Sequence, residues 1–306
     1  MKKQLIMFLI FLISISAAYS YGPNYHLFLT DNVFDQTSNP MTQLCSNHID
    51  YVRAGTLIPD ITITKYYDLG GKDYKLTHNW VFYEDVRSQI PNDDIEGRCF
   101  AYGIALHLIQ DGVSHNKIIP EGIEKWKIPN SFFHPLYESK IELQMLKQNP
   151  EYLETTTRVM GLLFESENER MLGWVQNAMG DSDINVKEMT LRLSNVLGTF
   201  YEDAYSPYPT EKQGFMFYVW KGIRAISNII PMSGFDDITR LSVQQTDYIF
   251  DNWNERTTNE LSKEPHGFTN LKYANTVPDT IKFVGLVVIV IYVVKNLGKI
   301  KRRFKK

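Results

Sequence analysis

The chain has 306 residues, 43% of them hydrophobic and 13% aromatic, which is enough for one large folded domain or two small ones. Of its 32 basic residues, two lie in residues 1–20 and seven in residues 295–306, and neither segment contains an acidic residue. Residues 21–294 therefore carry 23 basic and 35 acidic side chains. This negative body argues against a general nucleic-acid groove, because such grooves depend on clustered positive charge.

Residues 1–20 have the pattern of a secretory signal peptide. Lys2 and Lys3 precede the apolar run Leu5–Ile15, and small residues follow it. Cleavage after Ala18 or after Ser20 would satisfy the small-x-small rule, and an uncleaved anchor helix is the alternative. We therefore expect the body of the protein, residues 21–276, to lie outside the cytoplasm.

Two pairs of histidine and carboxylate residues occur at helical spacing. His107, Asp111 and His115 follow one another at intervals of four residues, which places them on one stripe of a helix. His134 and Glu138 repeat this spacing. Buried imidazoles and carboxylates need strong partners, and a set without thiolates suits a catalytic zinc or a similar divalent ion. An ordinary buried helix with hydrogen-bonded histidines is the alternative.

Three further candidate residues stand alone in the sequence. His26 precedes the apolar, helix-like segment Leu27–Phe34. A helix predicted over Ser46–Asp60 ends in a turn, where Asp60 directly follows a proline. His78 follows a glycine-rich loop. Each of these residues is unremarkable by itself, and it is their order along the chain that carries information.

The rest of the body is predicted to be helical. The sequence has no strand-rich region and no glycine-rich nucleotide-binding motif, so an all-α, multi-helix bundle is favoured. Apolar residues recur with a helical period in five later segments: Ile141–Leu146, Tyr152–Met179, Val186–Tyr205, Gly214–Ile230 and Phe235–Trp253. Cys45 and Cys99 could form one disulfide, although their spacing alone does not establish it.

A second apolar block lies near the carboxyl end. Thr280–Val294 contains a charge-free stretch shorter than the usual span of about 20 residues, so a transmembrane helix over residues 280–297 would have to tilt or cross a thin membrane. The basic residues 298–306 match a cytoplasmic tail by the positive-inside rule. An interfacial helix is the alternative. The interpretation favoured here is a single-pass protein of the cell membrane with an extracytoplasmic domain.

Taken together, these residues resemble the zinc-dependent phospholipase C family. They also resemble the catalytic domain of glycosylphosphatidylinositol-specific phospholipase D and the single-strand-specific zinc nucleases of the same superfamily. The resemblance covers Tyr21–Glu138, under half of the chain. It rests on elements that stand in the family's order: Gly-x-x-x-His26 after the predicted amino terminus, Pro59-Asp60, His78, His107-x3-Asp111, His115 and His134-x3-Glu138.

The resemblance implies an all-α domain around a cluster of two or three zinc ions. One ion would take Asp60, His78, His107 and Asp111. A second would take His115, His134 and Glu138. A third would take His26, Asp111 and the amine of Tyr21, the mature amino terminus after cleavage at Ser20, with Asp111 as a bridge.

The implied reaction is hydrolysis of a phosphodiester by zinc-activated water, with Asp60 as the general base. A phospholipid is the expected substrate. Glu138 stands where the nucleases tend to use Asp, and the negative body is a poor field for a nucleic acid. A nuclease-like phosphodiesterase and a non-catalytic zinc-binding membrane protein are the alternatives; the latter needs a closed site, whereas catalysis needs an open coordination position.

Two positions depart from the secreted bacterial phospholipases. The interval from Asp111 to His115 is shorter than theirs and is similar to that of the phospholipase D branch. Ile61 stands where choline-preferring enzymes carry an aromatic residue directly after the aspartate. An aromatic side chain could bind choline through a cation–π contact, so Ile61 leaves the identity of the head group open.

Overall fold

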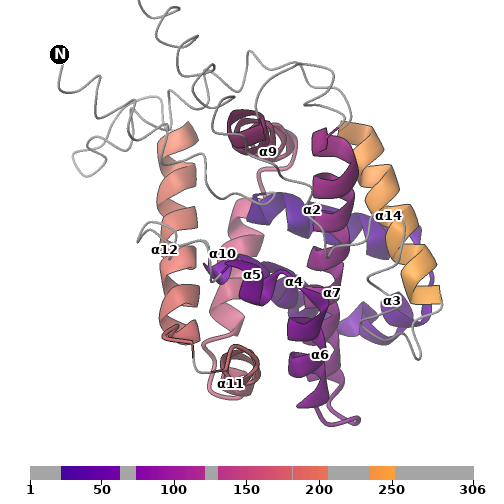
Figure 1. Cartoon of the computed structure of the whole chain (residues 1–306), viewed down its shortest axis with the longest axis vertical. Helices are drawn as coiled ribbons and strands as arrows, with labels where there is room; N and C mark the ends of the chain where they lie inside the picture. The colour runs from indigo at the N-terminus through magenta and orange to yellow at the C-terminus, as the bar shows by residue number, and fades with distance from the viewer. Residues whose placement is uncertain (1–21, 63–73, 121–129, 181, 206–234, 252–306) are drawn as a thin grey trace, which may run out of the picture.

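The structure is a computed structural model of the whole chain, and it describes residues 22–62, 74–120, 130–180, 182–205 and 235–251. All regular elements in these ranges are helices, which confirms the all-α fold class (Figure 1). No helix within the described ranges is both long and apolar enough to cross a membrane. The predicted signal peptide, Gly214–Ile230, the transmembrane segment and the basic tail lie outside the described residues.

The helices pack around one central helix, α7, in which 16 of 19 residues are buried. Helices α2, α3, α4, α6 and α14 contact it, while α10, α11 and α12 pack together beside α2, α4 and α6 (Figure 1). The elements are α2 (Pro23–Gln36), α3 (Pro40–Cys45), the short 3-10 helix η1 (Ser46–His48), α4 (Ile49–Leu57), α5 (Tyr74–Thr77), α6 (Trp80–Ser88), α7 (Ile95–Val113), the π-helical turn η3 (Ser114–Ile118), α9 (Asn130–Gln148), α10 (Tyr152–Leu162), α11 (Glu169–Ala178), α12 (Val186–Tyr205) and α14 (Phe235–Asp251).

Local capping fixes where several of these helices begin. The side chain of Asn79 accepts a hydrogen bond from the backbone N–H of Phe82 (2.9 Å) at the start of α6. Asp94 accepts one from the N–H of Gly97 (2.8 Å) at the start of α7. Such caps satisfy donors that have no partner within the helix. Because Asn79 directly follows His78, its cap also sets the path of the backbone at that histidine.

Helices α4 and α7 approach each other unusually closely, and two glycines permit it. A Cβ atom on Gly55 would lie 1.9 Å from the carbonyl oxygen of Phe100, and one on Gly103 would lie 2.0 Å from that of Val52. No residue with a side chain fits at either position without moving a helix. This contact brings the end of α4 against the middle of α7.

A disulfide joins α3 to α7 one turn before Gly103. Cys45 at the end of α3 is bonded to Cys99 of α7, with a Cα–Cα distance of 5.6 Å. Cys99, Gly103, His107 and Asp111 occupy successive turns of α7, so one stripe of this helix carries the disulfide, the glycine contact and two candidate ligands.

The observed elements differ from the sequence prediction in two places. Tyr152–Met179, predicted as one helical run, forms two helices, α10 and α11, joined by a turn in which the side chain of Asn168 donates to the carbonyl oxygen of Leu162 (3.1 Å). In addition, the regular α-helix ends at Val113, so His115 lies in the wider π-helical turn rather than on α7 itself. Such turns are frequent at functional sites.

Candidate metal centre

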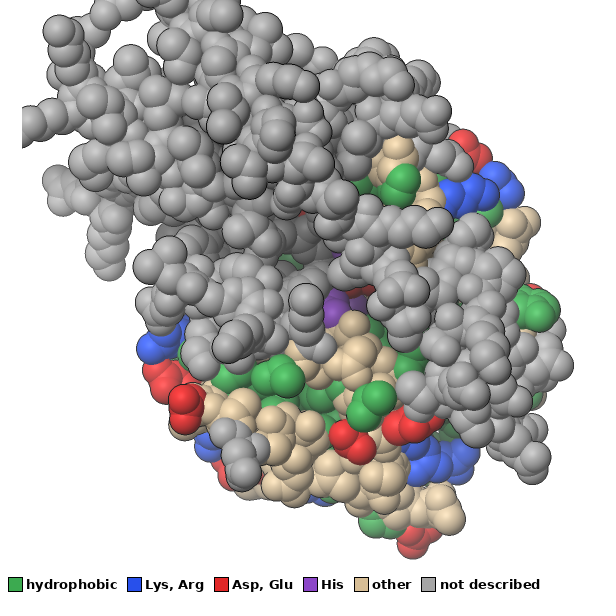
Figure 2. Space-filling model, in the orientation of Figure 1, with side chains coloured by type: hydrophobic (Ala, Val, Ile, Leu, Met, Phe, Trp, Pro, Cys, Tyr) green, Lys and Arg blue, Asp and Glu red, His purple; other side chains and the backbone are tan. Residues whose placement is uncertain are grey.

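The described candidate ligands come from different elements and meet in the interior. None of their side chains is more than 8% exposed. Histidine and carboxylate atoms are visible on one face of the molecule in Figure 2. The described candidate ligands are His26 of α2, Asp60 after α4, His78 before α6, His107 and Asp111 of α7, His115 of η3 and Glu138 of α9.

Four donor atoms converge in a first group. The Nε2 atom of His107 lies 3.2 Å from Nε2 of His78, 3.4 Å from Oδ2 of Asp111 and 3.8 Å from Oδ1 of Asp60. The Nε2 atom of His78 lies 3.4 Å from Oδ1 of Asp60 and 3.6 Å from Oδ2 of Asp111. Edges between the ligand atoms of a tetrahedral zinc site measure about 3.3–3.6 Å for bonds of about 2.0–2.2 Å. The donor atoms of Asp60, His78 and His107 therefore lie close to this spacing, and Oδ2 of Asp111 lies at a similar distance from both histidines.

The hydrogen bonds on the far side of each ring assign the tautomers of the two histidines. His107 donates from Nδ1 to the backbone carbonyl oxygen of Thr56 (2.8 Å). The hydroxyl of Thr77 donates to the carbonyl oxygen of Pro59 (2.8 Å), so it accepts from Nδ1 of His78 (3.1 Å). Both Nε2 atoms then present lone pairs to each other across 3.2 Å, an arrangement that a cation between them would stabilise.

Asp60 supplies a second reason to place a cation here. The residue is fully buried, and neither carboxylate oxygen accepts a hydrogen bond from a described residue. Burial raises the pKa of Asp60 to about 7, although the nearby His107 opposes the shift. A buried carboxylate without donors is costly unless a positive charge compensates it. The donor set of this group therefore fits a divalent metal ion.

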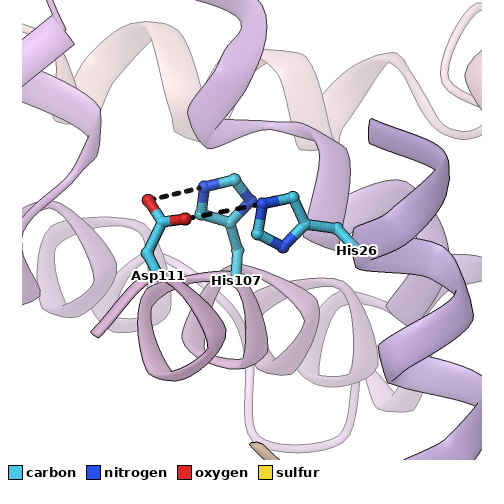
Figure 3. Close-up of side chains that lie close together, drawn as sticks. All are labelled: His26, His107 and Asp111. Carbon is cyan, nitrogen blue, oxygen red and sulfur yellow. Dashed lines mark ion pairs between the residues drawn. The ribbon is translucent and has the colours of Figure 1, made fainter. Parts of the chain in front are cut away.

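Asp111 connects this first group to a second. Its Oδ2 atom faces His107, whereas its Oδ1 atom lies 3.5 Å from Nε2 of His26 (Figure 3). Oδ2 also faces His78, and Oδ1 lies 3.5 Å from Nε2 of His115. Burial alone would raise the pKa of Asp111, but the nearby His107 and His115 lower it well below its ordinary value. The ionised carboxylate thus lies between two clusters of imidazoles, as a bridging ligand would.

His26 is oriented by a residue that the sequence analysis missed. Its Nδ1 atom lies 2.6 Å from Oε1 of Gln110, whose amide nitrogen donates to the hydroxyl of Thr30 (3.3 Å). This amide orientation makes His26 the donor at Nδ1 and leaves its Nε2 lone pair directed toward Asp111. Burial and the nearby His107 lower the pKa of His26 well below 6.5, so the ring is held in the neutral form that binds metals.

The match to known families decides how this arrangement should be classified. The family model for zinc-dependent phospholipase C matches residues 25–183, just over half of the chain, and the match includes all the described candidate ligands. The chain belongs to the zinc-dependent phospholipase C family. No curated protein and no solved structure matches it. The all-helical fold and the clustered histidine and carboxylate donors are in keeping with a zinc-dependent member of this family.

The remaining predicted ligands of this phospholipase C family member are described only in part. The Nε2 atom of His115 lies 3.9 Å from Oε1 of Glu138 on α9. Burial, together with the charges of Asp111 and Asp60, raises the pKa of Glu138 well above its ordinary value. His134 lies on α9 with its side chain outside the described residues, and Tyr21 lies outside them altogether. The three ligand sets implied by the resemblance stay predictions.

Ile61, the position at which this family member departs from the choline-preferring enzymes, has no exposed surface. It belongs to the hydrophobic core. The position that holds an aromatic residue in the choline-preferring enzymes is therefore a core position in this chain.

Sequence reasoning missed the groups that hold the histidines in place. Gln110 gives a signal that could have been used, because it is a lone amide in a nearly uniformly apolar stretch of α7. Thr56 gives none, because it acts through its backbone carbonyl group, which all residues share. Thr77 directly precedes His78, and only the fold reveals that its hydroxyl is already committed to Pro59.

Proposed function

We propose that this protein is a membrane-tethered phosphodiesterase that hydrolyses a phospholipid in the manner of a phospholipase C. The observation that carries the proposal is the pair of imidazole lone pairs facing each other across 3.2 Å, flanked by two buried carboxylates, within a chain of this family. Zinc, when bound, supplies Lewis-acid chemistry: it activates water near neutral pH and offsets the charge of a phosphodiester.

The candidate ligands would divide the tasks of holding metal ions and accepting a proton. Asp60, His78, His107 and Asp111 would hold one ion through the four converging atoms. Asp111 would offer its second oxygen to an ion held on the side of His26. Asp60 directs Oδ1 toward the histidines, which leaves Oδ2 as the atom that would take a proton from the attacking water.

The second ion and the third are proposed on the resemblance together with the partial geometry. His115 and Glu138 lie on the Oδ1 side of Asp111, and His134 lies one turn before Glu138 on α9. The amine of Tyr21 would complete the site of His26 once the signal peptide is removed. These residues would thus hold two further positive charges beside the first ion, where a charged phosphodiester would bind.

The proposed location rests on the two ends of the chain and on one internal feature. The Cys45–Cys99 disulfide supports export, because disulfides persist in oxidising compartments. The basic residues 298–306 support a cytoplasmic tail after a membrane helix over residues 280–297. Tethering would raise the rate at which the domain meets lipid without any new contact.

The test uses the full chain, exported with its own signal peptide and purified in detergent. We expect two or three zinc ions per chain by elemental analysis, a mature amino terminus at Tyr21 by mass spectrometry, and diacylglycerol release from mixed micelles. Phosphatidylcholine, phosphatidylethanolamine and phosphatidylinositol should be assayed beside single-stranded DNA and RNA. His107→Ala should abolish lipid hydrolysis, whereas His48→Ala, a histidine outside the cluster, should leave it unchanged.

The outcomes separate the three hypotheses. Diacylglycerol release that persists in His107→Ala would contradict the proposal. Nuclease activity without lipid turnover would identify a nuclease-like phosphodiesterase on the same scaffold. Full zinc occupancy with no activity on any of these substrates would favour a non-catalytic zinc-binding membrane protein.

A further inference from the structure

Helix α2, which carries His26, has no capping side chain of its own. Its N-cap residue is Gly22, and its first turn contains no acidic residue. The first backbone N–H groups of a helix need partners from outside the helix. In this structure the partner is Glu142 of α9, a buried side chain that the mechanism proposed above does not use.

Glu142 binds the start of α2 through both of its oxygens. Oε1 accepts hydrogen bonds from the backbone N–H of Asn24 (3.1 Å) and from its side-chain amide (2.7 Å), and Oε2 accepts one from the backbone N–H of Tyr25 (2.8 Å). A carboxylate at this end of a helix also interacts favourably with the helix dipole. The cap is therefore supplied by a residue that lies 118 positions later in the sequence.

Gly22 fits this contact because it has no side chain. A Cβ atom on Gly22 would lie 2.3 Å from Cδ and 2.5 Å from Oε2 of Glu142. The carbonyl oxygen of Gly22 accepts from the N–H groups of Tyr25 (2.9 Å) and His26 (3.3 Å), so this glycine begins the turn that ends at His26. The position of the His26 backbone is thereby fixed relative to α9.

Helix α9 also faces the second group of ligands, which is formed by His26, Asp111 and His115. Glu138, one turn before Glu142, lies 3.9 Å from His115, and both His115 and His26 approach Oδ1 of Asp111. Helix α9 thus contacts this group from two directions: Glu138 directly, and Glu142 through the first turn of α2. A cap within α2 would satisfy the same N–H groups without connecting the two helices.

We propose that Glu142 is a positioning residue for the metal ion held by His26 and Asp111, acting by fixing the first turn of α2 against α9. The inference rests on the proposed function only in requiring that a metal ion binds at His26. It assigns Glu142 no contact with the substrate. It predicts that the ion at His26 depends on Glu142, while the ion held by Asp60, His78 and His107 does not.

The experiment compares the full chain with two variants. In Glu142→Gln, the amide of the new side chain places a donor against a backbone N–H donor of α2. Gly22→Ala keeps the Glu142 carboxylate and adds one methyl group against it. His26→Ala is the reference for loss of this ion. Glu151→Gln, an exposed residue at the start of α10, is the matched control. Zinc affinity is measured by chelator competition, and cadmium-113 NMR gives a separate signal for each bound ion. Mass spectrometry verifies that all variants share one mature amino terminus.

We expect Glu142→Gln and Gly22→Ala to weaken the binding of one ion by about 10–100-fold, the usual effect of losing a group that orients a ligand. The same cadmium signal should change as in His26→Ala, and adding His26→Ala to Glu142→Gln should have little further effect. Glu151→Gln should match the unmodified chain. These measurements need no substrate. The Glu142 inference can therefore be contradicted while lipid hydrolysis is confirmed, and lipid hydrolysis can be contradicted while the Glu142 inference is confirmed.

Two results would overturn the inference. The first is that Glu142→Gln or Gly22→Ala keeps its helical content and binds zinc as tightly as the unmodified chain does. The second is loss of all bound zinc together with unfolding in both variants, because Glu142 would then support the whole fold rather than one metal position.

Discussion

At the scale of single residues, hydrogen bonds on the far sides of their rings hold His107 and His78 in place. Thr56 and Thr77 fix the far nitrogens of His107 and His78, so the near nitrogens can only accept. Preorganisation of this kind raises affinity because little side-chain freedom is lost on binding.

The hydroxyl of Thr77 should therefore matter to metal binding although it cannot reach a metal ion. Thr77→Val keeps the shape and removes the acceptor for Nδ1 of His78. We expect zinc affinity of the first group to fall by about 10–100-fold. Thr157→Val, on the exposed side of α10, is the control and should have no effect. Chelator competition measures both, and an unchanged affinity in Thr77→Val would show that the tautomer of His78 is fixed by another contact.

The raised pKa of Asp60 predicts an unusual dependence of stability on pH in the zinc-free chain. Burial raises this pKa from 3.8 to about 7, so between these values the folded chain retains a proton that the unfolded chain has lost. Rising pH therefore destabilises the fold through Asp60, by on the order of a few kcal/mol across this window. The lowered pKa of His26 makes the folded state more stable as pH rises toward about 6.5, which opposes the effect of Asp60. A comparison with a variant of Asp60 therefore separates the two contributions to stability.

The comparison is with Asp60→Asn, which carries no proton to lose. In chelator-treated protein, the free energy of unfolding of the unmodified chain minus that of Asp60→Asn should fall as pH rises from 4 to 7. Urea unfolding followed by circular dichroism provides both values. A difference that stays constant over this range would mean that Asp60 is already ionised in the zinc-free fold.

Helical spacing predicted that His107 and Asp111 would lie together, but the sequence did not predict what orients them. His107 and Asp111 share a helical stripe, and the structure places them 3.4 Å apart, as the spacing requires. The roles of these residues as zinc ligands stay predictions. The carbonyl group of Thr56 could not have been identified, because backbone acceptors leave no trace in residue identity. Glu142 left a partial trace: it follows Glu138 at helical spacing, and α2 begins without a cap.

At the scale of elements, the glycine contact between α4 and α7 places Thr56 against His107. Gly103→Ala should push the two helices apart, because its Cβ would lie 2.0 Å from the carbonyl oxygen of Val52. We expect a loss of at least about 1–3 kcal/mol in unfolding free energy, the range for overpacking, and weaker zinc binding as the bond from His107 to Thr56 lengthens.

Gly173→Ala is the matched control for this change. Gly173 also lies within a helix, but an added Cβ there would meet nothing within 4 Å. Alanine should be neutral or stabilise α11 by up to about 1 kcal/mol, since it favours helix more than glycine does. Thermal unfolding compares the two variants, and equal effects would indicate that helix propensity rather than close packing governs Gly103.

Element boundaries show where periodicity stops being informative. Apolar residues recur on both sides of the turn around Asn168, so period alone could not reveal that the chain breaks between α10 and α11. The π-helical turn at His115 is another case. An extra residue per turn changes which way a side chain points, yet no residue type marks it.

At the scale of the whole molecule, the disulfide ties α3 to the central helix across 54 residues of sequence. The chain-entropy model assigns a loop of this length about 4 kcal/mol of stabilisation, mostly through the unfolded state. Cys45→Ser with Cys99→Ser should lower the unfolding free energy by a comparable amount. In chelator-treated protein, dithiothreitol should destabilise the unmodified chain and leave the double variant unaffected, and equal sensitivity of both would mean that the bond does not form in the exported protein.

The proposed topology makes a prediction about intact cells. If residues 21–276 lie outside and residues 298–306 inside, external protease should remove the body and spare a tag on the carboxyl terminus. Immunoblotting before and after detergent permeabilisation measures both. A tag that is digested in unbroken cells would place the tail outside, or would show that residues 280–297 do not span the membrane.

The cap on α2 also sets an order of events during synthesis. Helix α2 is made early, yet the carboxylate that binds its first turn follows 118 residues later. At roughly 5–20 residues per second, that delay lasts roughly 6–24 s. Throughout this time the first turn of α2 lacks the partner that it has in the folded chain. The first turn of α2, and with it His26, is held against α9 only after α9 has been synthesised. The part of the candidate metal centre that contains His26 is therefore completed late during synthesis.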